Sequence, residues 1–113
     1  MKLVSFILLM IVTDSVFAGH FNDATISSVV VDANGIARVT LNGAKQVKAP
    51  AGCSVNGTKL TYDVNGPAGS AWHSMAIAAQ VAQKNVHIIG KNSCLVFNSS
   101  LYEEISTFYM LNQ

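Results

Sequence analysis

The sequence predicts a mainly β fold with a single helix. Short runs of alternating or β-branched residues occur on both sides of residues 65–84, the one long stretch with a helical character. The predicted order is therefore three strands, one helix, and then two or three strands. In a short chain this order matches an OB-fold-like Greek-key barrel of five to six strands, capped by one α-helix over about residues 66–84. An open α+β sheet with the helix on one face is the alternative.

Residues 1–18 are predicted to be a signal peptide. Lys2 supplies a positive charge, and the run "LVSFILLMIV" is apolar but too short to span a bilayer comfortably. Val16 and Ala18 then occupy the small-residue positions of a cleavage site, with the cut before Gly19. An uncleaved membrane anchor is the alternative. Residues 19–113 are expected to form one domain, secreted or periplasmic, without a further membrane span.

The first predicted unit is a β-hairpin. Asn34 and Gly35 lie between two β-rich runs, and this pair favours a type I′ turn, in which both central residues have positive φ. Later runs alternate in the same way; Leu60, Tyr62 and Val64, for example, share one side of a half-buried strand. Strands are expected over residues 25–32, 36–41, 58–64, 85–90, 94–97 and 103–111, with a loop over 42–57.

The predicted helix follows Asn65, a good N-cap, and has Pro67 in its first turn. One apolar stripe is expected to cap the barrel, with Trp72 and Met75 as its anchors. The opposite side is mixed and carries the aliphatic residues Ile77 and Val81. That side is either ordinary surface or a contact with neighbouring subunits. The expected core stripe consists of Ala68, Ala71, Trp72, Met75, Ala79 and Ala82.

The two cysteines, Cys53 and Cys94, both follow the predicted cleavage site. An even cysteine count in a small exported domain predicts a disulfide. Two free thiols, or half of a metal site, are the alternative, but no histidines lie at ligand spacing from the cysteines. We therefore expect a Cys53–Cys94 bridge and no metal.

Composition and motifs argue against catalysis and against binding of nucleic acid. The formal net charge is +1, and the chain contains three histidines and no recognisable nucleophile or metalloprotease motif. Glu103 and Glu104 are adjacent, so a strand turns them to opposite faces. Asn56 and Asn98 match the N-glycosylation pattern, which matters only in a eukaryotic secretory pathway. We expect no enzyme activity, no cofactor and no nucleic-acid partner; the aromatic residues Tyr62, Phe97, Phe108 and Tyr109 are expected to serve mainly the core.

Several short motifs occur in the same order as in a known family, which the chain therefore resembles. They are a Gly-containing hairpin after the first strand, "P-x-x-C", "YDV", "GPAG" opening an alanine-rich helix, and "KNVHIIGKNSC". Together they resemble small exported bacterial proteins related to the B subunits of AB5 toxins, of the subtilase-cytotoxin and typhoid-toxin type. The resemblance covers about residues 25–110.

The resemblance implies an OB-fold that assembles as a ring of five, with helices lining a central pore. In those toxins the B ring binds sialylated host glycans and carries an enzymatic A subunit. In the subtilase-type B subunit, an acidic residue and a serine four positions later contact the sugar, and "DATIS" offers Asp23 and Ser27 at that spacing. Plain solvation of Asp23 near the N-terminus is the alternative. On the helix, His73, Ile77, Gln80 and Lys84 are the residues expected to face the pore or a neighbouring subunit.

The leading functional expectation is therefore a non-catalytic B-subunit-like protein that binds host glycans as a pentamer. The alternative is a small secreted or periplasmic structural or interaction protein without affinity for sugars.

Overall fold

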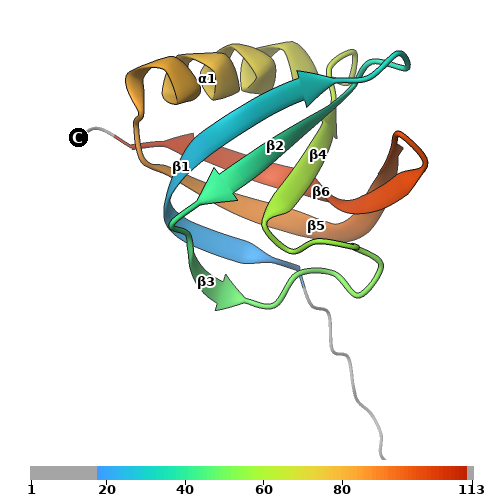
Figure 1. Ribbon diagram of the computed structural model, residues 1–113, viewed down its shortest axis with the longest axis horizontal. Helices are drawn as coiled ribbons and strands as arrows, with labels where there is room; N and C mark the ends of the chain where they lie inside the picture. Colours follow the sequence, from blue (N-terminus) through green and yellow to red (C-terminus); the bar gives the residue numbers. More distant parts are fainter. Residues whose placement is uncertain (1–17, 112–113) are drawn as a thin grey trace, which may run out of the picture.

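The structure is a strongly curved sheet covered at one end by a helix (Figure 1). The computed structural model describes residues 18–111, so residues 1–17 of the predicted signal peptide lie outside the described part. No helix in the described part is long and apolar enough to cross a membrane. The strands are β1 (His20–Val31), β2 (Ile36–Asn42), β3 (Lys45–Lys48), β4 (Lys59–Asp63), β5 (Val86–Phe97) and β6 (Ser100–Met110), and the helix is α1 (Gly69–Ala82).

Five of the strands close on themselves in the order β1-β2-β4-β6-β5-β1, and β3 extends the sheet beside β1. The β4–β6 pairing is parallel and all the others are antiparallel. The helix connects the third and fourth barrel strands, β4 and β5. The prediction of a mainly β, OB-fold-like barrel with one helix is confirmed.

The hairpin between β1 and β2 forms where it was expected, but its turn is not of type I′. Gly35 has a positive φ of 81°, whereas the φ of Asn34 is not positive. The Asp32 carboxylate instead accepts hydrogen bonds from the backbone N–H groups of Asn34 (2.9 Å) and Ile36 (3.0 Å). Although desolvation acts to raise it, these bonds and one from the Asn98 N–H hold the pKa of Asp32 below its usual value. An acidic side chain thus organises this turn.

β1, β5 and β6 each contain at least three residues outside their predicted strands, and β3 was missed. β1 begins at His20, five residues before the predicted start, and pairs there with both β3 and β5. β5 runs without a break through residues 86–97, where two separate strands were expected. The predicted loop over 42–57 contains β3, whose four residues are all exposed. A short exposed strand lacks the apolar alternation by which sequence reading finds strands.

The core fills the interior between the barrel and the helix. Because successive strand residues alternate between the two faces, β2 buries Ala37, Val39 and Leu41 and turns the intervening residues outward. The buried apolar cluster consists of Phe21, Ala24, Ile26, Ala37, Val39, Leu41, Leu60, Tyr62, Ala76, Ala79, Val86, Ile88, Ile105 and Phe108.

The helix begins at Gly69 rather than after Asn65, because residues 64–68 form turns. Its buried residues are Gly69, Ala76 and Ala79, while the predicted stripe members Ala71 and Ala82 are exposed. The predicted core stripe was therefore wrong in part, although Trp72 and Met75 pack partly buried against the core. Small alanine side chains let the helix lie close to the barrel, and they carry little signal that distinguishes one face from the other.

Candidate ligand-binding site

A hollow lies where β4 passes into α1. It is a cavity of about 190 Å³ lined by Asp63, Gly66, Pro67, Ala68, Gly69, Trp72, Lys91 and Glu104. This volume is below the roughly 300–1,000 Å³ of sites for drug-sized ligands. The cavity therefore fits one small unit, such as a single sugar ring, rather than an extended ligand.

Four elements, β4, α1, β5 and β6, and a tight turn build this cavity. Asp63 ends β4, and its side chain accepts a hydrogen bond from the Asn65 N–H (2.9 Å), while its carbonyl accepts one from the Gly66 N–H (2.9 Å). The turn brings the N-terminus of α1 beside the β5–β6 pair, which supplies Lys91 and Glu104. The site is therefore assembled from three segments of the chain, residues 63–72, Lys91 and Glu104.

The cavity combines charges of both signs. Lys91 Nζ lies 3.5 Å from Glu104 Oε2, and the lysine side chain remains more than half exposed. Ser93 Oγ donates to the other Glu104 oxygen at 3.3 Å. No side chain caps the first turn of α1 and that turn contains no acidic residue. The N-terminus of a helix carries a partial positive charge, so the attraction for an anionic group comes from this end and from Lys91, beside the two carboxylates of Asp63 and Glu104.

Trp72 forms the aromatic wall and is held in place from behind. Its ring meets Tyr62 edge to face, with centroids 6.2 Å apart. The Tyr62 hydroxyl lies 2.8 Å from His73 Nδ1 and can donate to it. Burial raises the pKa of Tyr62, so this phenol keeps its proton at neutral pH.

The buried Tyr62 predicts a loss of stability at alkaline pH. An unfolded tyrosine ionises near pH 10, whereas the folded Tyr62 stays protonated, so its stabilising contribution is present below pH 10 and is lost above it. Between pH 9 and pH 11, Tyr62 should lower the free energy of unfolding of the wild type by about 1.4 kcal/mol. We expect Tyr62→Phe to abolish this decrease. Urea unfolding at both pH values measures this difference. Tyr109→Phe, at a tyrosine that is 52% exposed, is the matched control and should keep the wild-type loss.

The residues predicted to contact a sugar lie elsewhere, on β1. Asp23 has a positive φ of 53°, and its carboxylate lies 3.5 Å from Lys45 Nζ. The Asp23 N–H donates to His87 Nδ1 at 3.2 Å. Ser27 is exposed, and its hydroxyl donates to the Thr40 carbonyl at 3.2 Å. Neither residue lines the cavity at Trp72, so the predicted sugar contacts and the cavity are separate places on the molecule.

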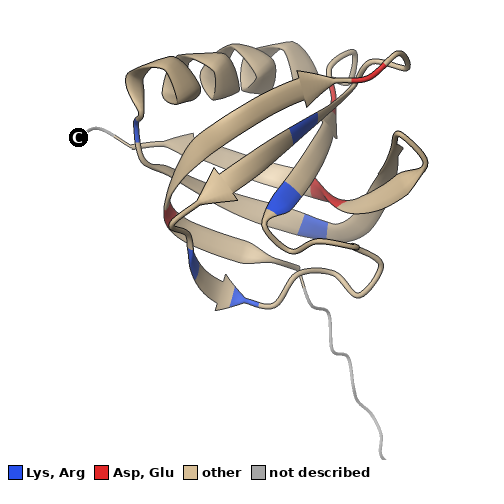
Figure 2. Ribbon diagram, viewed as in Figure 1, with Lys and Arg blue, Asp and Glu red and all other residues tan. Residues whose placement is uncertain are grey.

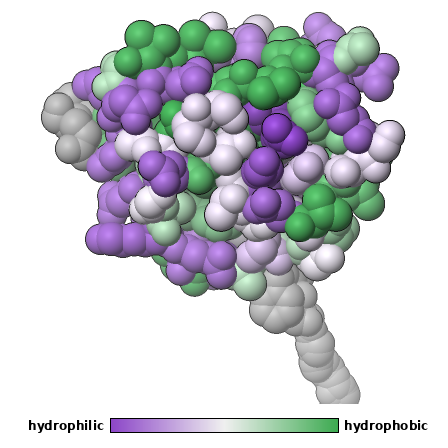
Figure 3. All heavy atoms as spheres, in the orientation of Figure 1, coloured by the Kyte–Doolittle hydropathy of each residue, from purple (hydrophilic) through white to green (hydrophobic). Residues whose placement is uncertain are grey.

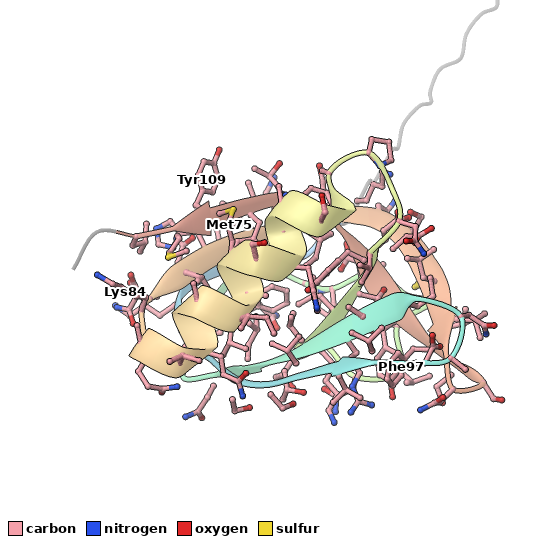
Figure 4. The ribbon with its side chains drawn as sticks, turned by 90° about the horizontal axis from the view of Figure 1, so that it is seen from above. Met75, Lys84, Phe97 and Tyr109 are labelled. Carbon is pink, nitrogen blue, oxygen red and sulfur yellow. A yellow bond between two sulfur atoms is a disulfide. The ribbon has the colours of Figure 1, made fainter. Side chains whose placement is uncertain are left out.

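The four helix residues predicted to face a pore or neighbour do not share one environment. His73 lies against Tyr62, and Gln80 Nε2 donates to the Ser27 carbonyl at 3.3 Å. Lys84 follows the end of α1 (Figure 4). Ile77 remains exposed at 42%, as does Val81 at 79%. Apolar side chains also gather along the edge of the molecule where α1 lies (Figure 3).

Most of the aromatic residues with an expected core role are buried, and the charged residues are dispersed. Tyr62, Phe97 and Phe108 are buried as expected, but Tyr109 is exposed and lies on the same side of α1 as Met75 (Figure 4). Charged residues are few and scattered over the face seen in Figure 2. Within residues 18–111, no three His, Cys, Asp or Glu side chains are grouped so that they could hold a metal ion.

Sequence reading found Trp72 but gave it only a core role, and it missed Asp63, Lys91 and Glu104 as neighbours in a site. The single tryptophan next to "GPAG" was the available signal. No protein-family model matches the chain, and no curated protein is similar to it in sequence.

Proposed function

We propose that this protein is an exported, non-catalytic saccharide-binding protein that works as a ring-shaped oligomer, with sialylated glycans as its ligand class. The observation that carries the proposal is the cavity at the start of α1, which places one tryptophan beside charged side chains and an uncapped helix N-terminus. Each part of an acidic sugar, namely its ring face, its hydroxyls and its carboxylate, has a matching group in this cavity.

The apolar face of a sugar ring packs on the indole of Trp72, which offers a large rigid surface. Its hydroxyls donate to the carboxylates of Asp63 and Glu104. Its own carboxylate is attracted by Lys91 and by the N-terminus of α1. The cavity size, about 190 Å³, limits the contact to one residue of the glycan.

Assembly supplies the strength that one small cavity lacks. A single contact of this size binds weakly, whereas a ring that presents several identical sites raises the effective concentration on a cell surface. Support for assembly comes from Ile77 and Val81, two aliphatic side chains exposed on α1. An enzymatic A subunit is the partner that such a ring would carry in a toxin of this type.

The proposal is tested by measuring how the exported protein, once its oligomeric state has been determined, binds to a glycan array. We expect signals on sialylated glycans and much weaker ones on their desialylated counterparts. Lys91→Met keeps the aliphatic stem but removes the ammonium, and we expect it to lower the apparent affinity about tenfold, as for loss of one charged hydrogen bond. Lys48→Met, at an exposed lysine on β3 away from the helix, is the matched control and should bind as the wild type does.

Ser27→Ala separates the two candidate places. If Ser27→Ala abolishes binding while Lys91→Met does not, the saccharide binds at β1, as the toxin resemblance implies, rather than in the cavity. An oligomeric wild type without any array signal contradicts the saccharide proposal. That result would favour the alternative, a structural or interaction protein without sugar affinity.

A further inference from the structure

The carboxylate of Glu103 is buried at the centre of a set of backbone amides. Its side chain is 1% exposed, on β6 opposite Cys94 of β5. Ala51 N–H donates to Oε1 at 2.9 Å, and Asn92 N–H donates to Oε2 at 3.0 Å. The third donor is the backbone nitrogen of Gly19, which lies 2.9 Å from Oε2 and 3.2 Å from Oε1.

No cationic side chain in the described part of the chain pairs with Glu103. The ion pairs there join Lys45 to Asp23 and Lys91 to Glu104. The three backbone N–H donors offset part of the cost of burying this carboxylate, but they bring no full positive charge to it. A positive charge placed among these amides would offset that cost.

Two glycines, Gly19 and Gly90, leave room for the Glu103 carboxylate. A Cβ atom on residue 19 would lie 2.7 Å from Glu103 Oε1 and 2.9 Å from the Phe21 ring. A Cβ on Gly90 would overlap the Glu103 carboxylate. Gly90 N–H in turn donates to the Gly19 carbonyl at 2.7 Å, which fixes the Gly19 backbone in this place.

We infer that cleavage of the Ala18–Gly19 bond creates an α-ammonium group that forms a buried ion pair with Glu103 and locks the mature fold. An export signal peptidase adds water across the peptide bond. The Ala18 carboxylate leaves with the leader, and the freed Gly19 amine takes up a proton, since α-amino groups have a pKa of about 7.7–8.0. The nitrogen already lies at ion-pair distance, so little rearrangement is needed.

This ion pair makes the stability of the fold depend on cleavage of the signal peptide, whether or not a glycan is bound. Before cleavage Gly19 N is an amide, and the Glu103 charge has no counter-charge among the described residues. After cleavage the same nitrogen is a cation. The uncleaved chain is thus held in a less stable fold, which suits a protein that crosses a membrane unfolded.

The test compares exported proteins whose N-termini are identified by mass spectrometry. The first comes from the full chain and should begin at Gly19. The second comes from a chain with one alanine inserted between Ala18 and Gly19, purified in the form that retains it. We expect the extra alanine, which moves the ammonium by about 3.8 Å, to raise the unfolding equilibrium constant at least tenfold.

Glu103→Gln, introduced into both proteins, should reduce that difference to less than threefold. Glu104→Gln removes the neighbouring, partly exposed carboxylate and should leave the tenfold difference intact. As a second readout, reductive methylation of the Gly19 amine should be at least tenfold slower in the native protein than in urea, with the lysines as internal reference. This readout and the alanine comparison decide the matter even if Glu103→Gln does not fold.

An exported protein that begins at another residue overturns the inference. So does an extra alanine without effect on unfolding, or a Gly19 amine that is methylated as fast in the native protein as in urea.

Discussion

Loss of the Cys53–Cys94 disulfide is expected to lower the free energy of unfolding by about 4 kcal/mol. The bridge closes a loop of 41 residues, and the chain-entropy relation gives that value for such a loop. The disulfide also lies beside the buried carboxylate. Ala51 and Asn92, each two residues before a cysteine, donate to Glu103. Without the bridge, both segments lose a restraint that holds their amides on the carboxylate.

Urea unfolding of the wild type and of the double variant Cys53→Ser, Cys94→Ser measures the effect. Reductant should bring the wild type to the midpoint of the double variant and should leave the variant itself unchanged. A wild type that yields two free thiols when it is unfolded without reductant contradicts the prediction, as does a midpoint that reductant does not move.

The sequence was sufficient to predict the barrel because most of its strands show a recognisable alternation of apolar and polar residues. The runs around Asn34–Gly35 and around Tyr62 both alternate in sequence, and β2 alternates in burial as a half-buried sheet requires. The prediction of a half-buried β4 was wrong, because Thr61 is also buried and its hydroxyl bonds to backbone carbonyls of β6. The helix was placed to within a few residues, but its buried face was partly misjudged. The exposed Ala71 and Ala82 look the same in sequence as the buried Ala76 and Ala79, and only packing against the barrel tells them apart.

The sites could not be predicted in the same way, because their parts are distant in sequence. Glu103 lies 84 residues from Gly19 and 52 residues from Ala51. The strand pattern predicted that Glu103 and Glu104 point to opposite faces. The structure confirms this, with Glu103 buried and Glu104 partly exposed. Nothing local in the sequence indicated that two distant amides and one from the neighbouring strand converge on one carboxylate.

Ile77→Asp is expected to dissociate the proposed ring into folded monomers. In an isolated subunit the new carboxylate simply faces water, because Ile77 is 42% exposed and lies outside the buried cluster. In a ring of five whose helices face one another, the substitution brings five carboxylates together around one axis. Two such charges about 8 Å apart repel by roughly 2 kcal/mol at an effective dielectric constant near 20.

Light-scattering mass, read together with circular dichroism, separates dissociation from unfolding. The variant should have the mass of one subunit and an unchanged spectrum, whereas the wild type should have the mass of five. Val55→Asp, which replaces an aliphatic side chain that is 65% exposed in the loop between β3 and β4, is the matched control and should remain assembled. If Val55→Asp dissociates the protein as well, added charge rather than the helix face is responsible. A wild type that stays monomeric at high concentration leaves Ile77 and Val81 as ordinary surface, since repulsion between subunits requires that the subunits meet.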